Sequence, residues 1–322
     1  MEKMVPSLFS TFIKGDFMRE SLKHYTPVAL LLAGLVLFSA VGTMLIGSTD
    51  TTRGGQRVLA VNYPLYIAAR EVVGDTDAVS VEQLAGNATG CLHDYQLSPG
   101  DRLAISRADM ILTVGDTPFL EGIADPAKVV DLAEGLEPLC ADHDHEHGHD
   151  HHETINDHVW MSPWRYKALV HGVAEALATI DTAHAAAYLA NDDRFGGEID
   201  RLRQQLQTAA AALPSRRCVI FHDSLAYLAD DLGLTVSLSL DVGEDSGVSA
   251  GDLAAVSRLA AEEPGLLLLY DDQYTVRYVG VDGLVPSSQV LRLDTVVSGD
   301  RQGNDWLDAM RYNVKVLQEA GR

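Results

Sequence analysis

The sequence predicts an α/β fold of two lobes, each with a small, mostly parallel sheet flanked by helices, joined by one long connecting helix. Three observations lead to this fold class. Short apolar runs alternate with helical patterns from residue 57 to about residue 132, the alternation restarts after Pro214, and a helical pattern rich in Ala, Leu and Arg fills residues 183–213. With 322 residues, 47% of them hydrophobic, the chain can bury two cores of ordinary domain size.

The first lobe is predicted over residues 57–182. Four short apolar runs bounded by turn residues are expected to be its strands: residues 58–62, 78–81, 110–114 and 129–132. Helical patterns over residues 66–73 and 98–107 separate the first three of them, and Pro163 is placed to open a helix that reaches about Ala178. Strands separated by helices predict a parallel sheet.

The connecting helix is predicted over residues 183–213. At 1.5 Å per residue it would be about 45 Å long. The pair Gly196 and Gly197 weakens the pattern, so either one straight helix or a kinked one fits, and Pro214 ends it. The second lobe, residues 214–322, repeats the alternation. Its expected strands are residues 218–221, 235–238, 266–270 and 290–293, and its expected helices are residues 224–232, 250–262 and 306–320.

An uncharged apolar segment covers residues 27–47, which is about the length that a bilayer core requires. Four basic residues precede it and two follow soon after, so the positive-inside rule predicts residues 1–26 as a cytoplasmic leader. The segment is longer than the apolar region of a cleavable signal sequence, which favours an uncleaved membrane anchor. Residues 48–56 then form a linker. The remaining chain is expected at the extracytoplasmic face of the membrane, or secreted or periplasmic if the segment is cleaved.

Charge limits the partners of the chain. The formal net charge is −22 and the isoelectric point is about 4.7. Such a chain repels nucleic acid phosphates and raises the local concentration of cations, although acidity also serves solubility. We therefore expect no nucleic acid partner.

The three cysteines cannot form a framework of disulfides. An oxidising compartment would allow Cys91 and Cys140 to pair, with Cys218 left as a buried thiol. Spacing alone does not decide this pairing, because a disulfide needs a defined geometry.

Residues 142–152 read DHDHEHGHDHH and hold six of the twelve histidines. Imidazole nitrogens suit zinc-like ions, and the carboxylates between them neutralise the charge of the metal. We expect an auxiliary weak metal loop with the donors His143, His145, His147, His149, His151 and His152. Residues 145–149 match the H-E-x-x-H pattern of metalloproteases, but Gly148 and the missing apolar stripe argue against the helix which that motif needs.

An ordered site is expected elsewhere, because three other histidines stand at the ends of predicted elements: His93, His158 and His222. The carboxyl ends of strands are where open α/β sheets bind ligands. An acid adjoins each histidine and would fix its tautomer: Asp94, Asp157 and Asp223. A structural hydrogen bond explains any one of these histidines alone, but the three together favour a metal site. His171 and His184 lie within helical patterns and are expected to be structural.

Three segments resemble the histidine motifs of the zinc and manganese solute-binding proteins of ABC importers. Residues 90–101 read GCLHDYQLSPGD, residues 157–163 read DHVWMSP and residues 221–229 read FHDSLAYLA. Residues 291–297, LRLDTVV, are similar to the segment in which this family carries a carboxylate ligand. The resemblance runs from about Val58 to the C-terminus and includes the long helix and the histidine-rich insertion before the second motif.

The resemblance implies a set of metal ligands, namely His93, His158, His222 and, as the fourth, Asp294. The segment 270–288 diverges from the family pattern, so the fourth ligand stays open between Asp294 and the alternatives Asp271, Asp272, Glu244 or water. Members that carry manganese or iron tend to have a carboxylate at the position of His222. A third imidazole there favours Zn²⁺ over Mn²⁺.

The resemblance also implies a function without catalysis. The chain would capture Zn²⁺ in the cleft between the lobes and deliver it, as a monomer, to an ABC permease and its ATPase. Because the connecting helix resists bending, we expect modest loop and lobe adjustments on binding. One alternative is an extracytoplasmic zinc hydrolase, which needs an open coordination position for water. The other is a manganese-binding or adhesin member of the same family.

Overall fold

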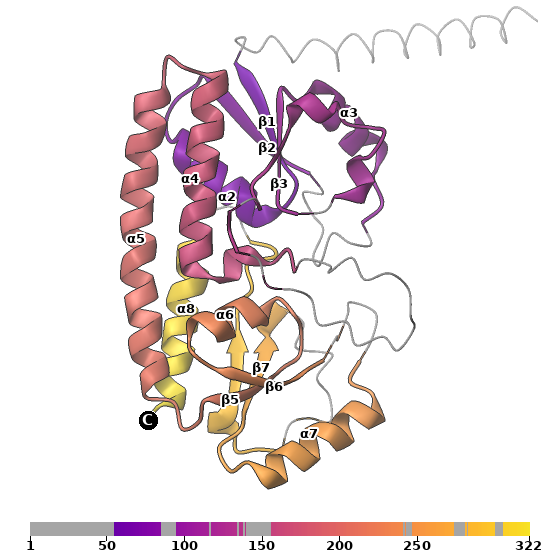
Figure 1. Cartoon of the computed structure of the whole chain (residues 1–322), viewed down its shortest axis with the longest axis vertical. Coiled ribbons are helices and arrows are strands. Elements are labelled where there is room, and N and C mark those ends of the chain that lie inside the picture. Colours follow the sequence, from indigo (N-terminus) through magenta and orange to yellow (C-terminus); the bar gives the residue numbers. More distant parts are fainter. Residues whose placement is uncertain are drawn as a thin grey trace, which may run out of the picture. The chain divides into compact units, whose positions relative to one another are not determined.

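A computed structural model describes the following residues: 55–84, 95–115, 117–133, 135–137, 139, 156–240, 242, 247–273, 281, 283–299 and 305–322. All of them belong to the compact unit Gly55–Arg322 (Figure 1). Several predictions lie outside the described residues: the leader, the apolar segment 27–47, the linker up to residue 54, the histidine-rich loop 142–152, His93, Cys91, Cys140 and Glu244. In the described part of the chain, no helix combines the length and the apolar character needed to cross a membrane.

The first lobe contains a parallel sheet with the strand order β2-β1-β3-β4. Its strands are β1 (Gln56–Ala60), β2 (Val79–Gln83), β3 (Met110–Thr113) and β4 (Val129–Asp131), and its helices are α2 (Tyr63–Val73) and α3 (Pro99–Arg107). Helix α2 begins three residues before the predicted start at Tyr66. The reason is local: Asn62 Oδ1 accepts a hydrogen bond from the main-chain N–H of Leu65, and Pro64 occupies the first turn.

The second lobe repeats the same arrangement with the parallel strand order β6-β5-β7-β8. Its strands are β5 (Arg217–Ile220), β6 (Thr235–Ser239), β7 (Leu267–Asp271) and β8 (Val290–Leu293), and its helices are α6 (Leu225–Asp231), α7 (Ala250–Glu262) and α8 (Asp305–Ala320). Every residue of β7 is buried, as expected for an interior strand of a parallel sheet. The order of the strands reverses between β5 and β7, and such switch points form crevices at the carboxyl ends of the strands.

Two long helices pack side by side along the lobes, as Figure 1 shows: α4 (Pro163–Ile180) and α5 (Ala185–Ala211). Helix α5 contacts α2 of the first lobe and α8 of the second, as well as α4. It runs without interruption through both glycines. Gly196 faces Lys167 of α4 so closely that a Cβ there would lie 3.1 Å from Lys167 Cε. The glycine therefore serves helix packing, and the single-helix alternative is the one observed.

Short 3-10 helices complete the described elements: η2 (Pro118–Leu120), η3 (Pro126–Lys128), η4 (Val159–Met161) and η6 (Ser287–Gln289). Among these, η4 has the largest structural role, because it lies directly before α4 and is fully buried. Ser162 then caps α4 by accepting a hydrogen bond from the main-chain N–H of Arg165, with Pro163 in the first turn.

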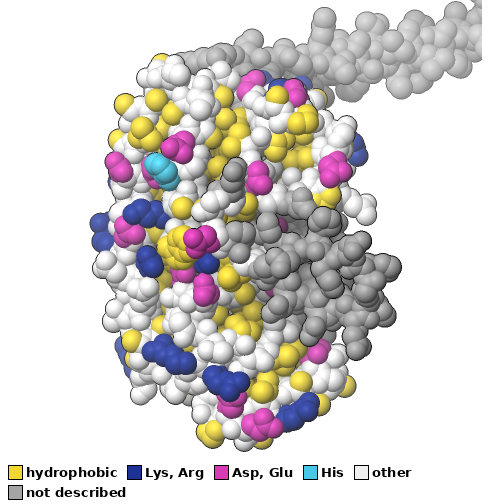
Figure 2. All heavy atoms as spheres, in the orientation of Figure 1, with side chains coloured by type: hydrophobic (Ala, Val, Ile, Leu, Met, Phe, Trp, Pro, Cys, Tyr) yellow, Lys and Arg dark blue, Asp and Glu magenta, His cyan; other side chains and the backbone are white. Residues whose placement is uncertain are grey.

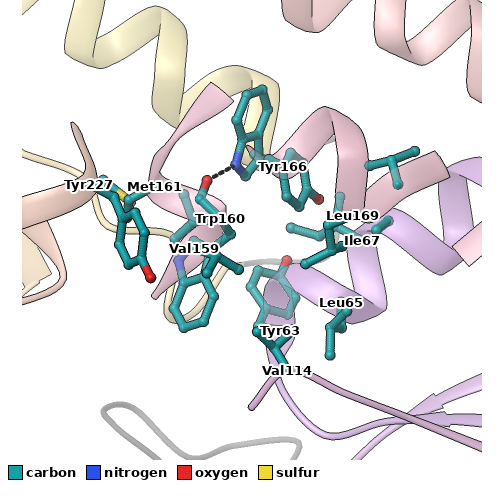
Figure 3. Close-up of a cluster of buried hydrophobic side chains, with 14 of the residues drawn as sticks. Tyr63, Leu65, Ile67, Val114, Val159, Trp160, Met161, Tyr166, Leu169 and Tyr227 are labelled. Carbon is teal, nitrogen blue, oxygen red and sulfur yellow. Dashed lines mark hydrogen bonds between the residues drawn. The ribbon is translucent and has the colours of Figure 1, made fainter. Parts of the chain in front are cut away.

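An aromatic cluster joins η4 and α4 to α8 (Figure 3). The ring of Trp306 stacks on that of Tyr166, with 4.4 Å between centroids, and Phe195 of α5 packs edge-on against Tyr166. The indole N–H of Trp306 donates to the carbonyl of Trp160 at 2.9 Å, the dashed line in Figure 3. One continuous hydrophobic core includes these residues and strands of both lobes. A second, smaller core lies under α7.

Charged side chains are spread over the described surface. Acidic and basic side chains are mixed on the described part of the face in Figure 2. The large hydrophobic side chains that are exposed, Leu103, Leu189, Val236 and Tyr312, come from separate elements. Isolated apolar side chains of this kind are usual at protein surfaces.

A histidine links the two long helices and gives the first prediction. His171 Nδ1 of α4 lies 2.7 Å from Asp192 Oδ2 of α5, and this hydrogen bond is the largest cause that raises the pKa of His171 above its usual value. Because the pKa of His171 is higher in the folded state, the pair contributes its full stabilisation of the fold below the unfolded pKa of about 6.5. That contribution is lost as the pH rises through the folded pKa.

We therefore expect His171→Asn to reduce the free energy of unfolding more at pH 5.5 than at pH 8.5. The difference should be about 0.2–1 kcal/mol, because the imidazole is half exposed and solvent screens the pair. Urea unfolding at both pH values measures it, and Asp192→Asn should remove the same pH-dependent contribution. A reduction of equal size at both pH values would contradict the charged His171–Asp192 pair.

Candidate metal centre

His158 stands at the entrance to η4, in the segment that leads into α4. Its side chain is only 2% exposed. The main-chain N–H of His158 donates to Asn156 Oδ1 at 3.0 Å, and the ring Nδ1 lies 2.9 Å from the same oxygen. The imidazole is therefore held by a neighbour two residues away as well as by burial.

His222 follows the central strand β5, two residues after its end. The main-chain N–H of Phe221 still donates to Leu269 of β7, so the strand pairing continues up to the histidine. His222 Nδ1 lies 2.9 Å from Ser224 Oγ and 3.1 Å from the main-chain nitrogen of Ser224. This placement at the carboxyl end of β5 agrees with the prediction.

The structure brings these two histidines together, although 64 positions separate them in the sequence. Their ring centroids are 5.3 Å apart and their planes are nearly perpendicular. Asp223 Oδ1 lies 3.1 Å from His222 Nδ1 and 3.6 Å from His158 Nδ1. Ligand atoms of His158, His222 and Asp223 all lie within 4.8 Å of one another, and this is the group with metal-binding geometry among the described residues.

Tyr227 of α6 holds the main chain of the segment before His158. Its hydroxyl donates to the carbonyl of Asn156 at 2.5 Å and accepts from the main-chain N–H of Leu139 at 2.9 Å. Burial raises the pKa of Tyr227 to about 12, so the hydroxyl keeps its proton and remains a donor at neutral pH. The segment before His158 is thus anchored to the helix that follows His222.

A polar network at the start of α4 makes the same connection. Ser162 Oγ donates to Asp231 Oδ2 at 2.9 Å, and the guanidinium of Arg165, itself buried, lies 3.2 Å from Asp230 Oδ2. Both acids stand at the end of α6. The two histidine-bearing segments are therefore fixed to each other at several points.

Asp294, the predicted fourth ligand, directly follows β8. Asn313 of α8 holds its main chain from both sides: Oδ1 accepts from the Asp294 N–H at 2.8 Å and Nδ2 donates to its carbonyl at 2.9 Å. Asp294 Oδ1 accepts from the main-chain N–H of Val296, and burial raises the pKa of the carboxyl. Asp294 is not part of the group formed by His158, His222 and Asp223.

The alternative ligands Asp271 and Asp272 lie at the end of β7. Asp271 is completely buried, and desolvation raises its pKa to about 7. Its two oxygens accept from the hydroxyl of Thr295 at 2.6 Å and from the main-chain N–H of Gln273 at 2.9 Å. Asp272 contacts the hydroxyl of Tyr312. These partners give Asp271 a structural role, and like Asp294 neither acid belongs to the group with metal-binding geometry.

Trp160 nevertheless contacts both His158 and the segment that carries Asp294. The indole N–H of Trp160 donates to the carbonyl of Thr295 at 2.9 Å, and its ring lies 5.0 Å from that of His158. His93, Asp94, Glu244 and the six histidines of the loop lie outside the described residues. The described donor set is two imidazoles and a nearby carboxylate, which suits a borderline divalent cation such as zinc.

Residues 58–320 match the model of the family ZnuA, described as zinc-uptake complex component A, periplasmic. The chain belongs to this family. Membership confirms the resemblance drawn from the histidine motifs. It also places the chain among components of uptake systems.

Two relatives illustrate the range of the family. The chain is 28% identical over 266 residues to the high-affinity zinc uptake system protein ZnuA of Paracoccus denitrificans, which covers 72% of this chain and 79% of the relative. It is 25% identical over 309 residues to the zinc-binding lipoprotein AdcA of Streptococcus pneumoniae, which covers 91% of this chain and 60% of AdcA. The chain thus spans less than two thirds of the length of AdcA.

Solved structures show the same fold. A zinc-bound variant of AdcAII from Streptococcus pneumoniae has a TM-score of 0.68 at 20% identity and matches 83% of this chain and 99% of its own. FpvC of Pseudomonas aeruginosa in complex with Mn²⁺ has a TM-score of 0.68 at 20% identity and matches 82% and 98%. The predicted α/β fold with two lobes of parallel sheet flanked by helices is confirmed. This fold occurs with either metal, so the donors must decide between them.

Sequence reasoning missed Asn156 and Tyr227. Asn156 stands two residues before the predicted ligand His158, and this position was the only sequence feature that could have pointed to its role. The contact of Tyr227 with Asn156 spans 71 residues, and no spacing rule reveals it.

Removal of the Tyr227 hydroxyl gives the second prediction. Tyr227→Phe leaves the buried carbonyl of Asn156 and the N–H of Leu139 without this partner, so the free energy of unfolding should fall by about 1–3 kcal/mol. Urea unfolding measures the change. Tyr66→Phe is the matched control, because its hydroxyl accepts an exposed bond from Arg70, and a change within about 0.5 kcal/mol is expected there. Equal effects of both substitutions would show that Tyr227 does not anchor the site.

Proposed function

We propose that this chain is the zinc-binding component of an ABC importer, which captures Zn²⁺ outside the cytoplasm and delivers it to a membrane permease served by an ATPase. The observation that carries the proposal is the convergence of His158 and His222, from two lobes, in a member of the zinc-uptake component A family. The zinc-binding relatives ZnuA and AdcA support the choice of metal.

His158 and His222 bind the metal in this proposal, His93 supplies a third nitrogen and Asp294 a carboxylate. Nitrogen-rich donor sets favour zinc, whereas manganese prefers oxygen donors and octahedral geometry. The site lies in the cleft between the lobes. Residues 142–152 form an auxiliary loop that gathers zinc weakly beside it.

The chain has no enzymatic activity in this proposal. The alternative, a zinc hydrolase, gains no support from a family of uptake components. The described residues offer no observation that favours the adhesin alternative. Residues 27–47 anchor the protein to the membrane, or direct it there if they are cleaved, and the protein acts as a monomer.

Removal of either described histidine tests the ligand assignment and gives the third prediction. His158→Ala and His222→Ala should each abolish tight binding of one zinc ion, because zinc then loses a nitrogen donor. Isothermal titration with Zn²⁺ at pH 7 measures this, in a chain that lacks residues 142–152 so that the loop does not contribute. Binding should also weaken as the pH falls, because protons compete with the metal for the imidazole nitrogens.

His171→Asn serves as the control, because His171 pairs with Asp192 on the long helices and should leave zinc affinity unchanged. Tight zinc binding that survives in both His158→Ala and His222→Ala would overturn the proposed function.

The fourth prediction separates the carboxylates. Asp294→Asn should lower zinc affinity about tenfold or more, equivalent to about 1.4 kcal/mol, because a charged donor is lost. Asp271→Asn should change it much less, since Thr295 and Gln273 occupy its oxygens. The same titration measures both. Unchanged affinity in Asp294→Asn, together with hydrolysis of an activated ester by the zinc-loaded protein, would favour the hydrolase instead.

A further inference from the structure

Asn156 holds the two histidine segments together with one side-chain amide. It is 3% exposed. Its Oδ1 accepts from the main-chain N–H of His158 at 3.0 Å and lies 2.9 Å from His158 Nδ1, while its Nδ2 donates to the carbonyl of Asp223 at 2.9 Å. All three contacts are to the segments that carry the two proposed ligands.

Main-chain groups fix the orientation of this amide. The N–H of His158 can only donate and the carbonyl of Asp223 can only accept, so Oδ1 must face the first and Nδ2 the second. A reversed amide would set donor against donor and acceptor against acceptor.

The tautomer of His158 follows from this orientation. Because its Nδ1 faces an oxygen that only accepts, Nδ1 must carry the proton of the neutral ring. The lone pair is then on Nε2, the nitrogen that can bind a metal. Nδ1 also lies 3.3 Å from Asp157 Oδ1 and 3.6 Å from Asp223 Oδ1, both acceptors as well. All three of these acceptors favour the same tautomer.

The other end of the amide controls the second ligand. The carbonyl of Asp223 accepts both from Asn156 Nδ2 and from the main-chain N–H of Ala226, in the first turn of α6. This turn begins at His222. A shift of His158 therefore displaces the turn that carries His222. The connection is the hydrogen bond between Asn156 and Asp223, which are 67 positions apart.

We propose that Asn156 is a positioning residue that presets the metal centre before the ion arrives. It selects the Nδ1–H tautomer of His158 and couples the place of that ring to the His222 turn. The coupling to metal affinity rests on the proposed function, whereas the tautomer does not. Partners that orient metal-binding histidines typically contribute 10–100-fold to metal affinity.

The test uses Asn156→Ala, Asn156→Asp and a matched control, Asn191→Ala. Asn191 also donates its amide to a main-chain carbonyl, that of Val72 at 3.0 Å, but it lies between α5 and α2. Long-range ¹H–¹⁵N spectra of the imidazoles in the metal-free protein at pH 8 report the tautomer of His158. Titration with Zn²⁺ reports the affinity.

In the wild type, His158 should show the Nδ1–H tautomer. Asn156→Ala removes the nearest acceptor and leaves the more distant Asp157 and Asp223 oxygens near Nδ1, so the Nδ1–H fraction should fall and zinc affinity should drop about 10–100-fold. Asn156→Asp keeps an oxygen acceptor and should restore the Nδ1–H tautomer, which a merely structural role would not explain. Asn191→Ala should leave both the tautomer and the affinity as in the wild type.

The proposal is overturned if wild-type His158 carries its proton on Nε2, or if Asn156→Ala keeps both the wild-type tautomer and the wild-type affinity. Should Asn156→Ala fail to fold, the wild-type spectrum and Asn156→Asp still decide the matter. A wild type that binds no zinc would refute the proposed function but not the tautomer, so the two failures are distinguishable.

Discussion

Trp160 joins the two lobes, and the arrangement of the metal centre depends on it. Its indole N–H donates to Thr295, beside Asp294, and its carbonyl accepts from the indole of Trp306. A short buried 3-10 helix is thereby clamped to two segments of the second lobe, and His158 is the residue that immediately precedes it. Buried polar groups must find partners, so these bonds and the surrounding aromatic core form together or not at all. The position of His158 therefore depends on the contacts between the lobes.

Two acids near this interface are costly to ionise. Asp271 is buried and Asp294 is partly buried, and desolvation raises the pKa of both carboxyls. The charge of Asp294 adds to the cost of ionising Asp271, since like charges repel in a medium of low dielectric constant. Hydrogen bonds from Thr295 and Val296 offset part of this cost. A divalent cation in the same region would offset much more, which is consistent with the proposed zinc site and with the negative net charge of the chain.

The sequence predicted the fold well because its information is local. Alternating strands and helices, the proline that opens α4 and the apolar β7 are all visible over a few residues. The placement of His158 and His222 was predictable for the same reason, since each stands at the end of an element, while their role as ligands remains a prediction. The single side-chain amide of Asn156 was not, because its bond to Asp223 links residues 67 positions apart. The role of Gly196 was hidden in the same way: it looks like a break in a helix until Lys167 is seen against it.

The continuity of the core limits how a bound ion can leave. A wide rotation between the lobes would break the two hydrogen bonds that join Trp160 to Thr295 and Trp306, each worth about 0.5–1.5 kcal/mol net. It would also expose Trp306 and Tyr166, each worth about 1.5–3 kcal/mol or more in burial. Helix α5, packed on α2 and α8, opposes the same movement. A local shift of the turn at His222 would break the bond from Asn156 and the contacts of Ser224 but leave both hydrogen bonds of Trp160 and the aromatic core in place. In the proposed function, release of zinc therefore proceeds by displacement of one ligand-bearing turn while the lobes stay packed.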